Sequence, residues 1–285
     1  MPERAETRPK WPAWYGLAAL GMALVIAVVA SGILFAVLKV AGVDFDADSP
    51  GVNITATLIQ DGALAVCAVW LAAQVGRPQP WQFGVRGTPF LRGLKWAAIA
   101  FAIYFGFQIL YVAAVHPHEE QTTLQDLGAG NGAAITLLIG VLVVGVAPAV
   151  EEFFFRGFFY SALRTRFSFL AAALIDGVVF GAVHAPTGIA AVPPLVALGF
   201  AFCLAYEATG SILPGVVLHA LNNMVAFGTD KDGSWAVGAT VAGLVLIACV
   251  TLPGRSRTLS ADATGGADDT PWRRDGVEPE HPGFR

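Results

Sequence analysis

The sequence contains little charge and few cysteines. Asp, Glu, Lys and Arg make up 13% of its 285 residues, about half the share found in a typical soluble domain. The formal net charge is −4 and no stripe of basic residues occurs, so nucleic-acid binding is not expected. The three cysteines lie far apart in apolar runs, which argues against disulfides or a cysteine metal site. The remaining composition, 55% hydrophobic with a mean hydropathy of +0.63, indicates an integral membrane protein.

Long apolar runs divide the chain into helix-length segments. A helix that crosses a hydrocarbon core of about 30 Å needs roughly 20 residues. Strands are not expected, because backbone groups in lipid must be satisfied within helices or closed barrels. We therefore predict an all-α fold, a polytopic membrane helix bundle of about eight transmembrane helices. The predicted spans are 12–40, 54–75, 90–115, 132–163, 168–185, 190–208, 212–228 and 235–253.

Basic and acidic residues occupy alternate connections between these spans. Lysines and arginines precede the first span and follow the second, fourth and eighth, whereas aspartates and glutamates follow the first and third. The positive-inside rule then predicts that both termini are cytoplasmic and that the acidic connections lie outside. We expect the protein in the plasma (cytoplasmic) membrane. The basic residues are Arg4, Arg8, Lys10, Arg77, Arg86, Arg92, Lys95, Arg164, Arg166, Arg255 and Arg257.

The chain divides into one membrane domain and two short ends. Residues 1–11 form a predicted cytoplasmic N-terminal segment, and residues 12–253 form the membrane domain. Residues 254–285 are rich in Gly, Pro, Asp and Arg, with too little apolar content to form a core. We therefore predict that this C-terminal segment is a disordered cytoplasmic tail.

Charged residues inside the fourth span are the main functional feature. A charge at membrane depth costs several kcal/mol, so Glu151, Glu152 and Arg156 are expected to face a polar cavity or a partner. Glu152 and Arg156 are four residues apart and can form an ion pair on one helix face. Glu151 points about 100° away from Glu152 around the helix. It is therefore free of this ion pair and can act as a general base on water. The alternative is an interfacial charge cluster at the cytoplasmic end of the span.

Two histidines lie in apolar segments of the later spans. His184 follows Phe180 by four residues, and His219 precedes Asn223 by four, so each pair shares a helix face. An imidazole and an amide on one face can donate two hydrogen bonds to a developing oxyanion or supply two metal ligands. Each pair alone is also typical of polar residues that pack between membrane helices.

Together, the motifs Glu-Glu-x-x-x-Arg, Phe-x-x-x-His and His-x-x-x-Asn, in this order on successive hydrophobic helices, resemble a known family. This is the CAAX prenyl endopeptidase and bacteriocin-processing family of intramembrane proteases, which includes the eukaryotic Ras-converting endopeptidase. The resemblance covers a motif core at about residues 130–228. It implies an eight-helix membrane enzyme with a catalytic cavity open to the cytoplasm.

The resemblance also implies roles for the motif residues. Glu151 and His184 would activate the attacking water, and His219 and Asn223 would stabilise the oxyanion. The supporting residues would be Glu152, Arg156 and Phe180. Glu151, His184, His219 and Asn223 could also form a zinc site with one position left for water. A bound Zn²⁺ and a metal-free glutamate–water mechanism therefore both stay open.

Two further acids lie outside the three motifs. Asp61 and Asp176 lie in apolar spans, but neither has the Gly-x-Gly-Asp context of an aspartyl intramembrane protease, so we expect structural roles. The expected partners are the lipid bilayer and a membrane-associated peptide or protein substrate, lipidated or not, cleaved near the cytoplasmic leaflet. A non-catalytic transporter or an immunity-type binding protein with the same polar core is the alternative.

Overall fold

The computed structural model describes residues 9–46, 49–117, 123–128, 130 and 132–251. Most of the predicted N-terminal segment and the whole predicted tail, residues 254–285, lie outside the described residues. Within the described residues the chain is helical and contains no strand, which confirms the all-α prediction. The helices are α1 (Tyr15–Val40), α2 (Pro50–Ala73), α3 (Phe90–Val115), the short α4 (Thr123–Asp126), α5 (Ala133–Gly140), α6 (Ala147–Glu152), α7 (Ser161–Leu163), α8 (Phe169–Val183), α9 (Val192–Thr209), α10 (Leu213–Thr229) and α11 (Trp235–Thr251). α5, α6 and α7 are parts of one long helix, Ala133–Leu163.

Every predicted span corresponds to one of these helices. In the part of the chain that the structure describes, five helices are long and apolar enough to cross a membrane. The helices α8, α10 and α11 are shorter. The chain is therefore a polytopic helical membrane protein, as predicted.

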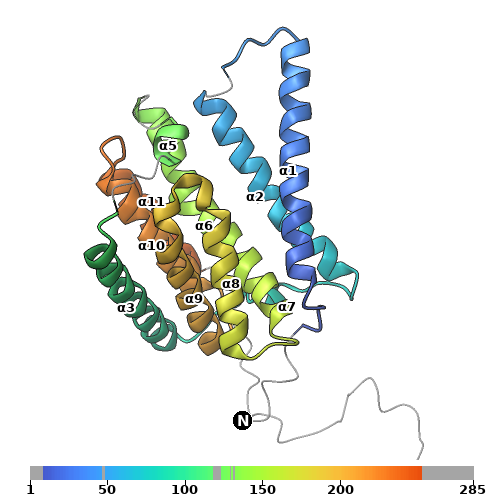
Figure 1. The fold of residues 1–285 in the computed structure, drawn as a ribbon, viewed down its shortest axis with the longest axis vertical. Coiled ribbons are helices and arrows are strands. Elements are labelled where there is room, and N and C mark those ends of the chain that lie inside the picture. Colours follow the sequence, from blue (N-terminus) through green and yellow to red (C-terminus); the bar gives the residue numbers. More distant parts are fainter. Residues whose placement is uncertain (1–8, 47–48, 118–122, 129, 131, 252–285) are drawn as a thin grey trace, which may run out of the picture. The chain divides into compact units, whose positions relative to one another are not determined.

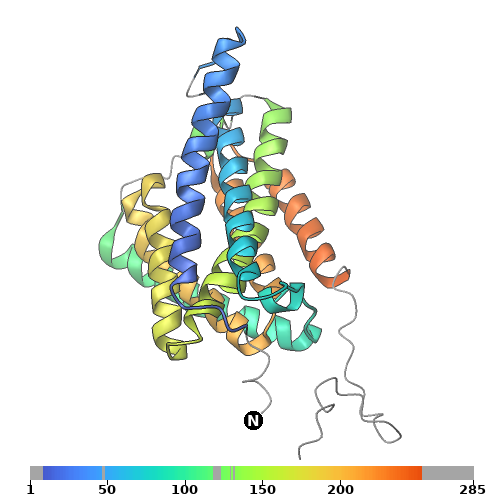
Figure 2. The same ribbon diagram turned by 90° about the vertical axis from the view of Figure 1, so that its right-hand side faces the viewer.

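The helices pack as antiparallel neighbours around the long helix Ala133–Leu163. In Figure 1, α1 and α2 form one flank and α3 forms the opposite flank, with α8, α9 and α10 between them. Figure 2 shows α1 and α2 side by side along most of their length. α8 packs on α9, and α10 packs on α11. The interior between them is filled by aromatic and small side chains, including the buried Phe154, Phe158 and Phe202.

The long helix Ala133–Leu163 is not a uniform α-helix. Two π-helical segments, Val141–Val146 and Phe153–Tyr160, lie on either side of the short α6 (Ala147–Glu152). A π-helical turn often accompanies a functional site and changes which side chains share a helix face. The sequence pattern did not predict these segments, which border the two glutamates.

The two ends of the bundle differ in charge. We call the end that contains the start of α1, the end of α2, the start of α3 and the end of α7 the basic end. Most described lysines and arginines lie there: Lys10, Arg77, Arg86, Arg92, Lys95, Arg164 and Arg166. We call the opposite end, with Asp44, Asp46 and Asp126, the acidic end. This separation agrees with the alternation of charge in the sequence.

Candidate active site

Glu151 lies close to two imidazole rings that come from different helices. Its Oε2 atom is 3.7 Å from Nε2 of His184 and 3.8 Å from Nε2 of His219. Glu151 lies in α6, His184 ends α8, and His219 lies in α10. The structure therefore brings together three side chains that are widely separated in sequence and were predicted to act together.

The His184 ring is oriented by the backbone of its own helix. Its Nδ1 donates a hydrogen bond to the carbonyl oxygen of Phe180, at 2.7 Å. Because a carbonyl oxygen can only accept, Nδ1 carries a proton and Nε2 is left facing Glu151. The fully buried Phe180 ring lies 4.8 Å from the His184 ring and 5.8 Å from the His219 ring, measured between centroids. Phe180 thus contacts both imidazoles.

His219 is held between two carboxylates. Its side chain is almost completely buried, with Nδ1 3.4 Å from Oε1 of Glu152 and Nε2 on the side of Glu151. The ring also lies 5.2 Å from the ring of Phe202, between centroids. These contacts on both nitrogens and on one face define the orientation of the ring.

The predicted ion pair between Glu152 and Arg156 is confirmed. Nη1 of Arg156 donates to Oε1 of Glu152 at 2.7 Å, and Arg156 is fully buried. The guanidinium carbon lies 4.6 Å from the Phe180 ring centroid and 4.9 Å from that of Phe202. Removing one partner of a buried pair costs about 3–5 kcal/mol. Glu152 is therefore fixed in position beside its neighbouring imidazole.

Asp176 joins the same buried group, which sequence reasoning missed. Its Oδ1 atom lies 3.5 Å from Nε of Arg156 and accepts a hydrogen bond from Sγ of Cys203 at 3.2 Å. All three side chains are fully buried. Asp176 thus has the expected structural role, because it supplies a second carboxylate to the guanidinium of Arg156. Residue spacing along α8 could not reveal it, because Arg156 and Cys203 belong to other helices.

Asp61 is the other acid that the sequence placed inside a span. It is 4% exposed, and its Oδ2 atom has no hydrogen-bond partner among the described residues. Asp61 lies in α2, close enough to Glu151 for the two carboxylates to interact electrostatically. The acids around the site therefore come from three helices, α6, α2 and α8, of which the sequence motifs identify one.

Asn223 is held by the backbone of another helix. Its Nδ2 donates to the carbonyl oxygen of Val143, at 2.9 Å. Val143 lies in the π-helical segment Val141–Val146, where hydrogen bonds join residues five apart. The residue five positions after Val143 is Pro148, which has no N–H to donate. The proline thus leaves a carbonyl for Asn223, and a proline inside an apolar span is a sequence feature that indicates such a site.

The four residues predicted to act in catalysis line one cavity of about 960 Å³. From the site the cavity extends to Asn53, Pro117 and Asp126 at the acidic end. None of its lining residues belongs to the basic end as defined above. The resemblance implied a cavity open to the cytoplasm, whereas the charge pattern placed the acidic end outside. In this fold those two expectations do not agree.

Glu151 and His219 lie nearer to the basic end than to the acidic end. At roughly 1.5 Å per residue, Glu151 is about 18 Å along its helix from Leu163 and about 27 Å from Ala133. His219 is about 9 Å from the start of α10 at Leu213. The site is therefore at the deep end of a cavity that extends toward the acidic end.

The option of a bound Zn²⁺ stays a prediction from the sequence. Two ligands that share a tetrahedral zinc ion lie about 3.4 Å apart, less than the 3.7 and 3.8 Å between Glu151 and the two imidazoles. Oδ1 of Asn223 already accepts a hydrogen bond from Asn222. Among the residues placed by the structure, no group of three or more His, Cys, Asp or Glu side chains is arranged to hold a metal.

Residues 133–225 match the family described as Type II CAAX prenyl endopeptidase Rce1-like. This range contains all three motifs that carried the resemblance. The match covers about a third of the chain, so the similarity is to this segment of the chain. The predicted relationship to the CAAX prenyl endopeptidases is thus confirmed, and the Rce1-like segment supplies Glu151, both imidazoles and Asn223.

Two curated proteins of Bacillus subtilis (strain 168) are similar to parts of the chain. "Putative membrane peptidase YdiL" is 34% identical over 90 residues, which are 32% of this chain and 36% of that protein. "Uncharacterized protein YyaK" is 29% identical over 184 residues, which are 59% of each chain. The chain thus spans between about a third and three fifths of the length of these relatives. No solved structure is a significant match.

Proposed function

We propose that this protein is an intramembrane endopeptidase that hydrolyses a peptide bond of a membrane-associated peptide or protein. The observation that carries the proposal is the position of one Glu151 oxygen within 3.8 Å of two imidazole nitrogens inside a membrane bundle. The large cavity beside these groups and the Rce1-like segment support it. Ionisable groups inside membrane helices cost free energy, so a cluster of them indicates a functional site.

Glu151 and His184 activate the attacking water in this proposal. Their separation of 3.7 Å is too long for a direct hydrogen bond and leaves room for a water about 2.8 Å from each. Glu151 takes a proton from this water as the water oxygen bonds to the carbonyl carbon of the substrate. When the carbon–nitrogen bond breaks, that proton passes to the departing amine, and the glutamate is regenerated.

His219 and Asn223 stabilise the oxyanion that forms on the substrate. The Asn223 amide has a second N–H besides the one that binds Val143. This N–H and the Nε2 side of His219 both face the cavity and donate to the carbonyl oxygen as its charge develops. Donors that are already oriented stabilise such a transition state most effectively, because no rearrangement is needed during the reaction.

The supporting residues maintain this geometry. Arg156 neutralises Glu152, Glu152 orients His219, and Phe180 packs against both imidazoles. None of the three needs to contact the substrate. Their substitution is expected to change the position of the catalytic groups and not their chemical identity.

The substrate in this proposal is a membrane-associated chain that enters the cavity from the acidic end or from the lipid. The cavity wall includes apolar side chains such as Val28, Phe105 and Leu195, which suit an apolar segment or a lipid group. CAAX-type processing of a prenylated peptide is the form that the Rce1-like family suggests. Cleavage takes place in the half of the bundle nearer the basic end, which the charge pattern assigns to the cytoplasmic leaflet.

Cleavage of two reporters by the purified full chain in liposomes tests the proposal. One reporter carries a prenylated Cys-a-a-X terminus, and the other is an unmodified single-span peptide with a fluorescent label. We expect cleavage of at least one, and its loss in Glu151→Gln. Cleavage retained in Glu151→Gln overturns the mechanism. No cleavage of either reporter, together with transport or partner binding that does not depend on Glu151, favours the non-catalytic alternative.

A further inference from the structure

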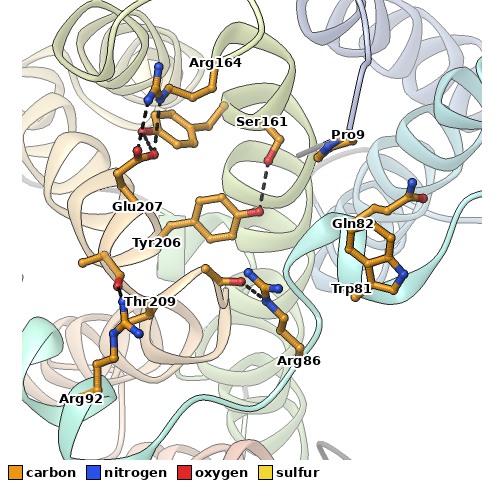
Figure 3. Close-up of a pocket in the computed structure, with 13 residues that line it drawn as sticks. Pro9, Trp81, Gln82, Arg86, Arg92, Ser161, Arg164, Tyr206, Glu207 and Thr209 are labelled. Carbon is orange, nitrogen blue, oxygen red and sulfur yellow. Dashed lines mark hydrogen bonds and ion pairs between the residues drawn. The ribbon is translucent and has the colours of Figure 1, made fainter. Parts of the chain in front are cut away.

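A second, smaller pocket lies at the basic end, far from the active-site cavity. Its volume is about 180 Å³. It is formed where the turn after α2, the start of α3 and the ends of α7 and α9 meet, as Figure 3 shows. Three arginines line it: Arg86, Arg92 and Arg164. None of these residues belongs to the motifs discussed above.

Arg164 is already paired within the protein. It contacts both carboxylate oxygens of Glu207, at 3.1 and 3.3 Å, and its third nitrogen donates to the carbonyl oxygen of Phe167. Tyr160 donates to the same carboxylate at 2.8 Å. Figure 3 shows Arg164 and Glu207 at one side of the pocket. Arg164 and Glu207 therefore cancel each other's charge, and the excess charge of the pocket comes from the other two arginines.

Arg86 and Arg92 bind backbone carbonyls at the end of α9. Nε of Arg86 donates to the carbonyl of Gly210, and one terminal nitrogen of Arg92 donates to that of Ala208. In the part of the chain that the structure describes, neither arginine forms an ion pair with a carboxylate. Capping of α9 accounts for one nitrogen of each. Arg86 and Arg92 therefore keep their full charge. The N–H groups that do not bind these two carbonyls remain at the pocket.

Exposed apolar side chains lie at the start of α3, next in sequence to Arg92, which lines this pocket. Phe90 is 62% exposed, Leu91 76% and Leu94 54%, and all three lie in the first turns of α3 beside Arg92. Trp81, which lines the pocket, is 44% exposed. Tryptophan beside basic residues at the end of apolar helices is typical of the membrane–water interface. The pocket therefore adjoins both a charged surface and a surface suited to acyl chains.

We propose that this pocket binds the phosphate group of an anionic phospholipid. The planar guanidinium groups of Arg86 and Arg92 match phosphate geometry, and each can donate two hydrogen bonds to it. Basic pockets between membrane helices bind anionic headgroups elsewhere by the same chemistry. Inorganic phosphate shares that chemistry, but the apolar surface formed by Phe90, Leu91 and Leu94 favours the lipid. The proposal does not depend on the proposed peptidase activity.

Native mass spectrometry of the full chain in detergent tests this site. The probes are phosphatidylglycerol, phosphatidylcholine and inorganic phosphate. The test variant is Arg86→Gln with Arg92→Gln, in which glutamine keeps an N–H for the α9 carbonyls and removes the charge. The control variant is Arg77→Gln with Arg166→Gln, which removes the same charge from exposed positions at the same end, outside the pocket.

We expect phosphatidylglycerol to bind the wild type and the control variant, and to bind the test variant roughly 25-fold more weakly, since each basic residue contributes about a factor of five. An equal loss in both variants overturns the site, because the effect would then be general charge. Equal binding of phosphatidylcholine also overturns it. Displacement of the lipid by inorganic phosphate at low millimolar concentration assigns the pocket to free phosphate and rejects the lipid.

A second measurement does not depend on the variants folding. Binding of phosphatidylglycerol to the wild type should weaken as the salt concentration rises, because exposed charges are screened within about 10 Å at 0.1 M salt. Lipid binding that is unchanged between low and high salt contradicts the proposed contact with Arg86 and Arg92.

Discussion

Asn223 donates a hydrogen bond from its side-chain amide to the backbone carbonyl of Val143. This bond joins α10 to the π-helical segment that precedes α6, the helix that carries Glu151. Pro148 makes the contact possible, because it lacks the N–H that would otherwise bind the same carbonyl. The position of Asn223 thus depends on the π-helical geometry of another helix.

Asn223→Ala should lower both stability and activity. A buried carbonyl left without a donor costs about 1–3 kcal/mol, and the oxyanion loses one donor. Adding Pro148→Ala supplies a backbone N–H for Val143, so we expect the double variant to regain thermal stability in detergent but not cleavage. Recovery of cleavage as well would show that Asn223 is only a packing residue.

Glu151→Gln and Glu152→Gln should separate chemistry from folding. Glu151 has no ion-pair partner other than the two imidazoles among the described residues, so its replacement should leave the unfolding temperature nearly unchanged. Loss of a general base should lower kcat by about 10²–10⁴. Glu152→Gln leaves Arg156 with a weaker partner, and we expect a clear loss of stability. The comparison is made by reporter cleavage and thermal unfolding of both variants, and the reverse result would exchange the two roles.

Asp176→Asn should destabilise the protein although Asp176 does not line the active-site cavity. The substitution keeps the size of the side chain and removes one of the two carboxylates around Arg156. We expect a loss of up to about 3 kcal/mol, measured by unfolding in detergent. Cys203→Ala, which removes the other partner of Asp176 but no charge, serves as the matched control and should cost less.

Gly215→Ala should reduce activity by moving Glu152. A Cβ atom at position 215 would lie 2.6 Å from Oε2 of Glu152, which is closer than van der Waals contact allows. Gly243→Ala in α11 is the matched control, because nothing lies within 4 Å of its added Cβ. We expect the control to be neutral or slightly stabilising, since alanine favours helices by about 1 kcal/mol. Equal cleavage rates in both variants would show that the position of Glu152 does not matter for the reaction.

Much of the fold follows from the sequence because apolar run length decides where helices cross lipid. The exact ends of the helices were less predictable. The span predicted at 212–228, for example, begins one residue later, at Leu213. The site residues were identifiable because Glu151, His184 and His219 are ionisable groups in apolar surroundings, where each needs a partner. Helical spacing correctly paired Glu152 with Arg156.

The rest of the site depends on contacts between helices that spacing cannot show. Asp176 reaches Arg156 across a helix interface, and its distance from His184 along α8 gave no indication of that contact. The bond between Asn223 and Val143 required a π-helical segment, which a regular α-helical projection does not contain. The direction in which the cavity opens depends on how α1, α2 and α3 are arranged around it, and this is a property of the whole bundle.

The depth of Glu151 limits which bonds the protein can reach. A chain that enters from the acidic end must cover about 27 Å, and an extended chain advances about 3.3 Å per residue. Roughly eight unfolded residues must therefore separate the cleaved bond from any folded part of the substrate outside the membrane. In the proposed reaction, compact domains with a shorter tether would stay intact, and tether length would select among substrates as well as sequence.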